Sequence, residues 1–122
     1  MNRRAFIKRS SLATVAVASG MRTPLFSQNT PLKIGLIGSG WYGLVIAKAA
    51  LQAGGVEIVA VSDVDSEHLK NGVKELEALQ GTPPRAFKDY RDLLEIPGMQ
   101  AVLIGTPPHW HALQFVDACK KG

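Results

Sequence analysis

The chain has 122 residues, enough for one domain of modest size, and 46% of them are apolar and 20% charged. Its net charge of +4 comes from the start, because residues 1–30 hold five Lys or Arg and no acids, whereas residues 31–122 hold nine basic and ten acidic residues. The globular part is therefore close to neutral, which argues against a nucleic-acid partner. The single cysteine, Cys119, excludes an internal disulfide.

The first thirty residues have the pattern of an export signal. Arg3 and Arg4 are followed by Phe6 and Lys8, and the mildly apolar stretch 11–20 comes next. That stretch is too short to span a membrane, which takes about 20 apolar residues. The pattern resembles the twin-arginine signal, which implies the twin-arginine export machinery as a partner and a periplasmic or otherwise exported location. The alternative is a basic tail or an uncleaved interfacial anchor.

From residue 31 onward, apolar runs alternate with helical patterns. Strands are expected at 32–37, 56–62, 85–87 and 101–104. Helices are expected at about 42–53, 66–80 and 110–121, with a brief helix after Asp89. The last helix gathers apolar residues on one side, namely Ala112, Phe115, Val116 and Cys119. The alternation predicts an α/β fold, a Rossmann-like doubly wound parallel sheet with its first four strands in the order 3-2-1-4.

A glycine motif, Gly38-Ser39-Gly40-Trp41-Tyr42-Gly43, lies between the first strand and the first helix. Gly38 suits a tight turn, Gly40 allows the backbone to approach a pyrophosphate, and Gly43 allows the helix to pack closely on the strand. The first N–H groups of the helix would point at the phosphates. These six residues are predicted to bind a dinucleotide, with Trp41 and Tyr42 lying either against the cofactor or on neighbouring residues.

An acidic residue, Asp63, stands at the carboxyl end of the second strand, twenty residues beyond Gly43. An acid at this place in the fold bonds the adenosine ribose hydroxyls. A carboxylate would repel a 2′-phosphate, and the following Val64 supplies no positive charge, so NAD is favoured over NADP. The alternative is that Asp63 only begins a polar loop in front of Asp65, which caps the next helix.

A second cluster, Thr106, Pro107 and His111, follows the fourth strand at the same edge of the sheet. With the glycine motif and Asp63, it resembles the N-terminal domain of the Gfo/Idh/MocA oxidoreductases, over about residues 33–122. The resemblance implies that Thr106 and Pro107 position the nicotinamide half of the cofactor and that His111 lies near the active-site cleft. His111 is either a ligand or catalytic residue, or a helix-start histidine satisfied by backbone groups. No metal is expected, because the histidines around Trp110 have no acidic partner.

Members of this family continue with a fifth strand that ends in Glu-Lys-Pro, whose lysine is the main catalytic candidate, and then with a substrate-binding domain. Neither is present, so we expect a signal peptide and lead-in at 1–30, an incomplete NAD(P)-binding domain at 31–122, and a catalytic lysine beyond the chain end. Together with the export signal, the resemblance implies an exported oxidoreductase that transfers hydride between nicotinamide and a sugar or polyol CH–OH group, homo-oligomeric at full length. The alternatives are an NAD-dependent glycoside hydrolase of the same family and a non-catalytic nucleotide-binding protein. The fragment alone is expected to be inactive.

Overall fold

The computed structural model describes residues 30–122, so the export signal predicted in the leader lies outside the described residues. The strands are β1 (Leu32–Ile37), β2 (Val56–Ser62), β3 (Arg85–Phe87) and β4 (Ala101–Ile104). The helices are α2 (Trp41–Ala53), α3 (Ser66–Gln80), α4 (Tyr90–Leu93) and α5 (Pro108–Lys120). Each strand is followed by a helix, as the alternating pattern predicted. None of the helices in this part of the chain is long and apolar enough to cross a membrane.

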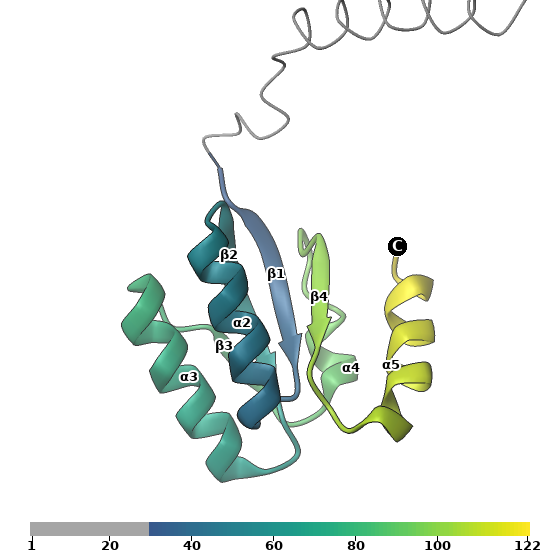
Figure 1. Cartoon of the computed structure of the whole chain (residues 1–122). Coiled ribbons are helices and arrows are strands. Elements are labelled where there is room, and N and C mark those ends of the chain that lie inside the picture. Colours follow the sequence, from purple (N-terminus) through teal and green to yellow (C-terminus); the bar gives the residue numbers. More distant parts are fainter. Residues whose placement is uncertain (1–29) are drawn as a thin grey trace, which may run out of the picture.

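The four strands form one parallel sheet in the order β3-β2-β1-β4 (Figure 1). This arrangement confirms the predicted Rossmann-like α/β fold. The central pair, β1 and β2, carries nearly continuous apolar runs because both faces of a parallel sheet are covered by helices. A register shift between Ile34 and Gly35 interrupts the pairing of these two strands.

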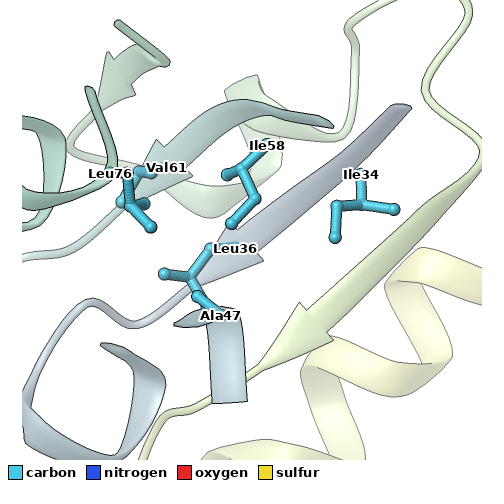
Figure 2. Packing of buried hydrophobic residues seen from close by; sticks show 6 residues of the cluster. All are labelled: Ile34, Leu36, Ala47, Ile58, Val61 and Leu76. Carbon is cyan, nitrogen blue, oxygen red and sulfur yellow. The ribbon is translucent and has the colours of Figure 1, made fainter. Parts of the chain in front are cut away.

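Apolar side chains pack on both faces of the sheet, because successive residues of a strand point to opposite faces. On one face the sheet packs against α2 and α3, and the buried cluster comprises Ile34, Leu36, Ala47, Ile58, Val61 and Leu76 (Figure 2). The other cluster includes Ile37 and Ala60, with Leu93 and Leu94 from the α4 segment and Ala118 of α5 packed against it. The neighbouring residues Leu36 and Ile37 thus fix β1 between two layers of helices.

Helix α3 begins at a capped end. The side chain of Asp65 accepts hydrogen bonds from the backbone N–H groups of Glu67 and His68, at 2.9 and 3.1 Å. These bonds, the one from His68 first, lower the pKa of Asp65 below its ordinary value of 3.8. The helix ends at Gly81, which adopts the left-handed conformation with φ of 84°.

Helix α5 faces the rest of the domain with Gln114, Asp117 and Ala118. Gln114 is only 5% exposed, whereas Phe115 is 62% exposed. Asp117 accepts a 2.6 Å hydrogen bond from the hydroxyl of Tyr90, which raises the pKa of that tyrosine. The sequence predicted that Ala112, Phe115, Val116 and Cys119 lie on one side of this helix. In the described part of the chain, all four are exposed. The helix also begins at Pro108, earlier than expected, because proline is favoured in the first turn.

Candidate functional site

The carboxyl ends of the four strands meet at one edge of the sheet, and backbone hydrogen bonds extend the pairing past the strands. Gly38 donates its N–H to the carbonyl of Ser62, and Gly105 donates to Ile37, each at 2.8 Å. Asp63 donates to the carbonyl of Phe87 at 3.2 Å. The predicted site residues, which are scattered between positions 38 and 111, are therefore brought to the same edge.

The glycine turn between β1 and α2 requires two of its three glycines for its own conformation. Gly38 has a φ of 88°, a backbone conformation that residues other than glycine rarely adopt. A Cβ atom on Gly43 would lie 1.8 Å from the carbonyl oxygen of Gly38. Gly40 differs, because its φ of −67° is ordinary and a Cβ there would meet no protein atom closer than 3.8 Å, in the ring of His68.

The end of β4 lies directly on this turn. A Cβ atom on Gly105 would lie 2.4 Å from the Cα of Gly43 and 3.0 Å from the carbonyl oxygen of Gly38. The methyl group of Thr106 packs on the other side, 2.8 Å from the position of a Cβ on Gly38. Gly105 was not among the predicted site residues, although a glycine between the fourth strand and Thr106-Pro107 was a signal that could have identified it.

Asp63 links the glycine turn to the loop that precedes α3. Its Oδ2 accepts hydrogen bonds from the backbone N–H of Ser39, at 2.8 Å, and from the hydroxyl of Ser39, at 3.2 Å. Its Oδ1 accepts a third bond from the N–H of Asp65, at 2.9 Å. The carboxylate is thus held beside the turn by three hydrogen bonds.

Ser39 itself is 1% exposed and lies beneath α3. The close approach depends on Gly72, where a Cβ atom would lie 2.7 Å from the Cβ of Ser39. Sequence reasoning missed Gly72, because a glycine inside a helix gives no sign of which distant residue it accommodates.

The N-terminus of α2 is accessible to a ligand. It receives no side-chain cap and has no acidic residue in its first turn, so its N–H groups point toward the edge without an internal side-chain acceptor. Trp41 is 81% exposed and Tyr42 52%, with ring centroids 6.2 Å apart. Val64, beside Asp63, is 82% exposed. This region therefore combines amide donors, aromatic surface and one fixed carboxylate.

The β4–α5 loop is held by the first turns of α5. The hydroxyl of Thr106 donates to Oε1 of Gln114 at 2.5 Å. Nε2 of His111 lies 2.6 Å from the carbonyl oxygen of Thr106. Since a carbonyl oxygen only accepts, Nε2 carries the hydrogen and Nδ1 is the ring atom left to accept one. His111 is thus engaged with the backbone in the manner of a helix-start histidine, with one nitrogen still available. Pro107 precedes the helix and is exposed.

Two other features of residues 30–122 bear on the kind of site. No group of three or more His, Cys, Asp or Glu side chains lies close enough together in this range to hold a metal ion. A groove of about 380 Å³ runs along α3 beside Ala86, and none of the predicted site residues lines it. The chemistry-bearing residues are therefore those of the strand-end edge.

A parallel sheet with a glycine turn after β1, an acid after β2 and an uncapped N-terminus of α2 defines a dinucleotide-binding domain of the Rossmann type. A family model described as "Oxidoreductase family, NAD-binding Rossmann fold", GFO_IDH_MocA, matches residues 32–122. The chain belongs to this family. This match confirms the family that the sequence motifs resemble, whose domain is described as an NAD-binding Rossmann fold.

Individual relatives agree with this placement. A glycosyl hydrolase family 109 protein of Stenotrophomonas maltophilia (strain K279a) is 33% identical over 130 aligned positions, covering 100% of this chain and 28% of the relative. The rhizopine catabolism protein MocA of Rhizobium meliloti is 30% identical over 93 positions, covering 76% and 27%. Among solved structures, scyllo-inositol dehydrogenase of Lactobacillus casei with bound NAD(H) and scyllo-inositol superposes with a TM-score of 0.64 at 26% identity, covering 76% and 26%. The chain thus spans about a quarter of the length of the proteins it matches.

Proposed function

We propose that this chain binds NAD along the strand-end edge and that it forms the cofactor-binding part of an NAD-dependent oxidoreductase. In the whole protein the reaction would be hydride transfer between the nicotinamide ring and a sugar or polyol CH–OH carbon. Bound NAD supplies the hydride acceptor or donor for that reaction. The residues of this chain supply the binding surface, because the catalytic lysine expected from the family pattern is not among them.

The main observation in support of cofactor binding is the open space beside the Cα of Gly40. Gly38 and Gly43 are needed by the fold itself, through a positive φ in one and a contact of 1.8 Å in the other. Nothing in the described chain requires glycine at position 40. A molecule outside the chain that approaches the backbone closely explains the missing side chain, and a pyrophosphate at a helix N-terminus is such a molecule.

The geometry suggests how NAD would lie. Its pyrophosphate would meet the N–H groups of Gly40, Trp41 and Tyr42, and the adenosine ribose would lie at Asp63. The nicotinamide half would then extend toward Thr106 and Pro107, on the neighbouring strand end. His111, whose Nδ1 has no hydrogen-bond partner within residues 30–122, would stand on that side as a ligand or proton acceptor.

The preference for NAD over NADP rests on charge. Asp63 is held in place beside the turn by three hydrogen bonds, and its exposed neighbour Val64 carries no positive charge to receive a 2′-phosphate. A second negative group at this place would be repelled and would lack a cationic partner. The described edge therefore favours a ribose with two free hydroxyls.

Export, assembly and substrate class are part of the same proposal. The basic leader resembles a twin-arginine signal, and that pathway carries folded proteins, so NAD bound in the cytoplasm would travel with the enzyme to the periplasm. The structural relative that carries NAD(H) also carries scyllo-inositol, a polyol, which supports a polyol or sugar substrate here. A homo-oligomer is proposed for the full-length protein.

The names of the relatives favour a second candidate function, an NAD-dependent glycoside hydrolase. Two relatives that match this chain over its entire length are named for glycosyl hydrolase family 109. Such an enzyme would oxidise a sugar carbon, cleave the glycosidic bond and re-reduce the product with the same cofactor, with no net redox change. Cleavage of a chromogenic glycoside by the full-length protein without added NAD would favour the hydrolase, and NAD-dependent oxidation of a polyol would favour the dehydrogenase.

Calorimetric titration of NAD into the wild-type chain and into Gly40→Ala tests cofactor binding. We expect the wild type to bind and Gly40→Ala to bind at least about tenfold more weakly, since its methyl group would occupy the path of the phosphate. The variant should still unfold cooperatively, because replacing glycine by alanine at an N-cap costs only about 1 kcal/mol. Equal affinity of the two proteins for NAD would contradict the proposed site.

A further inference from the structure

The carboxylate of Asp63 has most of its hydrogen-bonding capacity filled from within the chain. An ionised carboxylate offers about four acceptor positions. Oδ2 receives both the N–H and the hydroxyl of Ser39, and Oδ1 receives the N–H of Asp65. One position remains, and it is on Oδ1.

We propose that Ser39 is a specificity-determining residue. Its buried hydroxyl holds Asp63 in the one orientation that accepts a ribose hydroxyl and rejects a 2′-phosphate. This inference rests on the proposed function, because it concerns the choice between the two forms of the same cofactor.

The hydrogen bond of the Ser39 hydroxyl to Asp63 can be distinguished from the packing of a buried serine. Its hydroxyl is enclosed beneath α3, where Gly72 leaves just enough space for the serine Cβ, so water cannot replace the bond to Asp63. Ser62 offers a direct comparison one residue before Asp63. It is 2% exposed, but its hydroxyl has no hydrogen-bond partner in the described chain. Of these two buried serines, only Ser39 donates its hydroxyl to the carboxylate of Asp63.

The discrimination follows from the single acceptor position that remains. A ribose hydroxyl can donate its hydrogen to the free position on Oδ1. A dianionic 2′-phosphate has no hydrogen to donate there and brings charge of the same sign. Asp63 could accommodate it only by turning away, which would break its bonds to Ser39 and Asp65. Without the Ser39 hydroxyl, the backbone N–H groups of Ser39 and Asp65 alone would resist that turn.

The test is a pair of calorimetric titrations, with NAD and with NADP, on the whole chain. The variants are Ser39→Ala, its matched control Ser62→Ala, and Ser39→Cys, which replaces the hydroxyl with a thiol, a weaker donor. We expect the ratio of NAD affinity to NADP affinity to fall about tenfold in Ser39→Ala, the effect of losing one hydrogen bond to a charged group. The ratio should fall less in Ser39→Cys and stay unchanged in Ser62→Ala.

The possible outcomes separate this inference from the proposed function. A wild type that binds NAD, together with a Ser39→Ala ratio equal to that of the wild type, would overturn the specificity role and leave NAD binding intact. Parallel losses of NAD and NADP affinity would mean a merely structural role and would also overturn it. A folded wild type that binds neither dinucleotide would contradict the proposed function and this inference with it. If Ser39→Ala fails to fold, Ser39→Cys provides the comparison, with a smaller fall in the ratio expected and an unchanged ratio overturning the role.

Discussion

Gly105 and Gly43 touch backbone to backbone, since a Cβ atom on Gly105 would lie 2.4 Å from the Cα of Gly43. This contact presses the end of β4 onto the first turn of α2, and both partners of the contact are backbone atoms that cannot rotate away. The glycine turn is therefore shaped by a segment more than sixty residues further along the chain as well as by its own sequence.

We predict that Gly105→Ala destabilises the domain by about 1–3 kcal/mol, the usual cost of forcing a methyl group into a filled space. Urea unfolding followed by circular dichroism measures this change. Gly40→Ala is the matched control, because it adds the same methyl group at the same edge of the sheet, in open space within the glycine turn. Equal unfolding midpoints for Gly105→Ala and the wild type would contradict the backbone contact.

Replacement of Asp63 by alanine is expected to have two effects. The fold should lose about 2–4 kcal/mol, because the N–H groups of Ser39 and Asp65 and the Ser39 hydroxyl lose a charged acceptor. NAD affinity should also fall, because the ribose loses its partner. Calorimetry with NAD, performed where the variant is still folded, measures the second effect. Unchanged NAD affinity in folded Asp63→Ala would refute the assignment of Asp63 to the ribose.

Tryptophan fluorescence should report where NAD binds. The sequence contains two tryptophans. Trp41, the first residue of α2, is 81% exposed, and Trp110, in the first turn of α5, is 47% exposed. If the pyrophosphate lies at the N-terminus of α2, NAD should change the emission of Trp41 most. Titrations should therefore show the change in Trp110→Phe and lose most of it in Trp41→Phe. The reverse pattern would place the ligand elsewhere on the edge.

The tautomer of His111 is a further prediction. The bond between Nε2 and the Thr106 carbonyl requires the neutral ring to carry its hydrogen on Nε2. Long-range proton–nitrogen NMR correlations should therefore give the Nε2–H pattern for His111, with the exposed His109 as a reference. A neutral His111 protonated on Nδ1 would mean that the bond to the Thr106 carbonyl does not form in solution.

The cap of α3 should make stability depend on acidic pH. The backbone N–H groups of His68 and then Glu67 lower the pKa of Asp65 in the folded state. A carboxyl group whose pKa is lower in the folded state stabilises the fold at pH values above its pKa in the unfolded state. This contribution is lost as the pH falls through its pKa in the folded state. Asp65→Ala should therefore unfold at lower urea than the wild type at neutral pH. The difference should shrink as the pH drops below 3.8, the ordinary value.

Asn at position 65 provides the control, because it caps a helix without a charge. Asp65→Asn should retain much of the stability at neutral pH and show less dependence on acid. A gap between wild type and Asp65→Ala that stays constant through the acid range would contradict the role of the Asp65 charge.

The sheet could be predicted from sequence because its information is local. Continuous apolar runs such as Ile58–Val61 mark strands covered on both sides, and residues such as Asp65 and Gly81 mark the ends of the helices between them. The glycine turn and Asp63 could be located for the same reason, since each is defined by its distance from a strand end.

The orientation of α5 could not be predicted in this way. Its apolar residues repeat at helical spacing, yet the side that faces the domain carries Ala118 together with polar residues bonded to other elements. Thr106 bonds Gln114, and Tyr90 bonds Asp117. Likewise, the fit of Ser39 beneath Gly72 joins two segments whose proximity has no local signature in the sequence. These relationships depend on distant contacts, which periodicity does not record.

The most direct test of the account is an NMR titration of the isotopically labelled chain with NAD. The backbone amides of Gly38 to Gly43 and of Asp63 should shift most, with smaller changes at Thr106. The amides of Gly54 and Gly55, at the opposite end of α2, should not move. The largest shifts at that opposite end, or a folded chain whose amide spectrum does not respond to NAD, would contradict the claim that the glycine turn is a nicotinamide dinucleotide site.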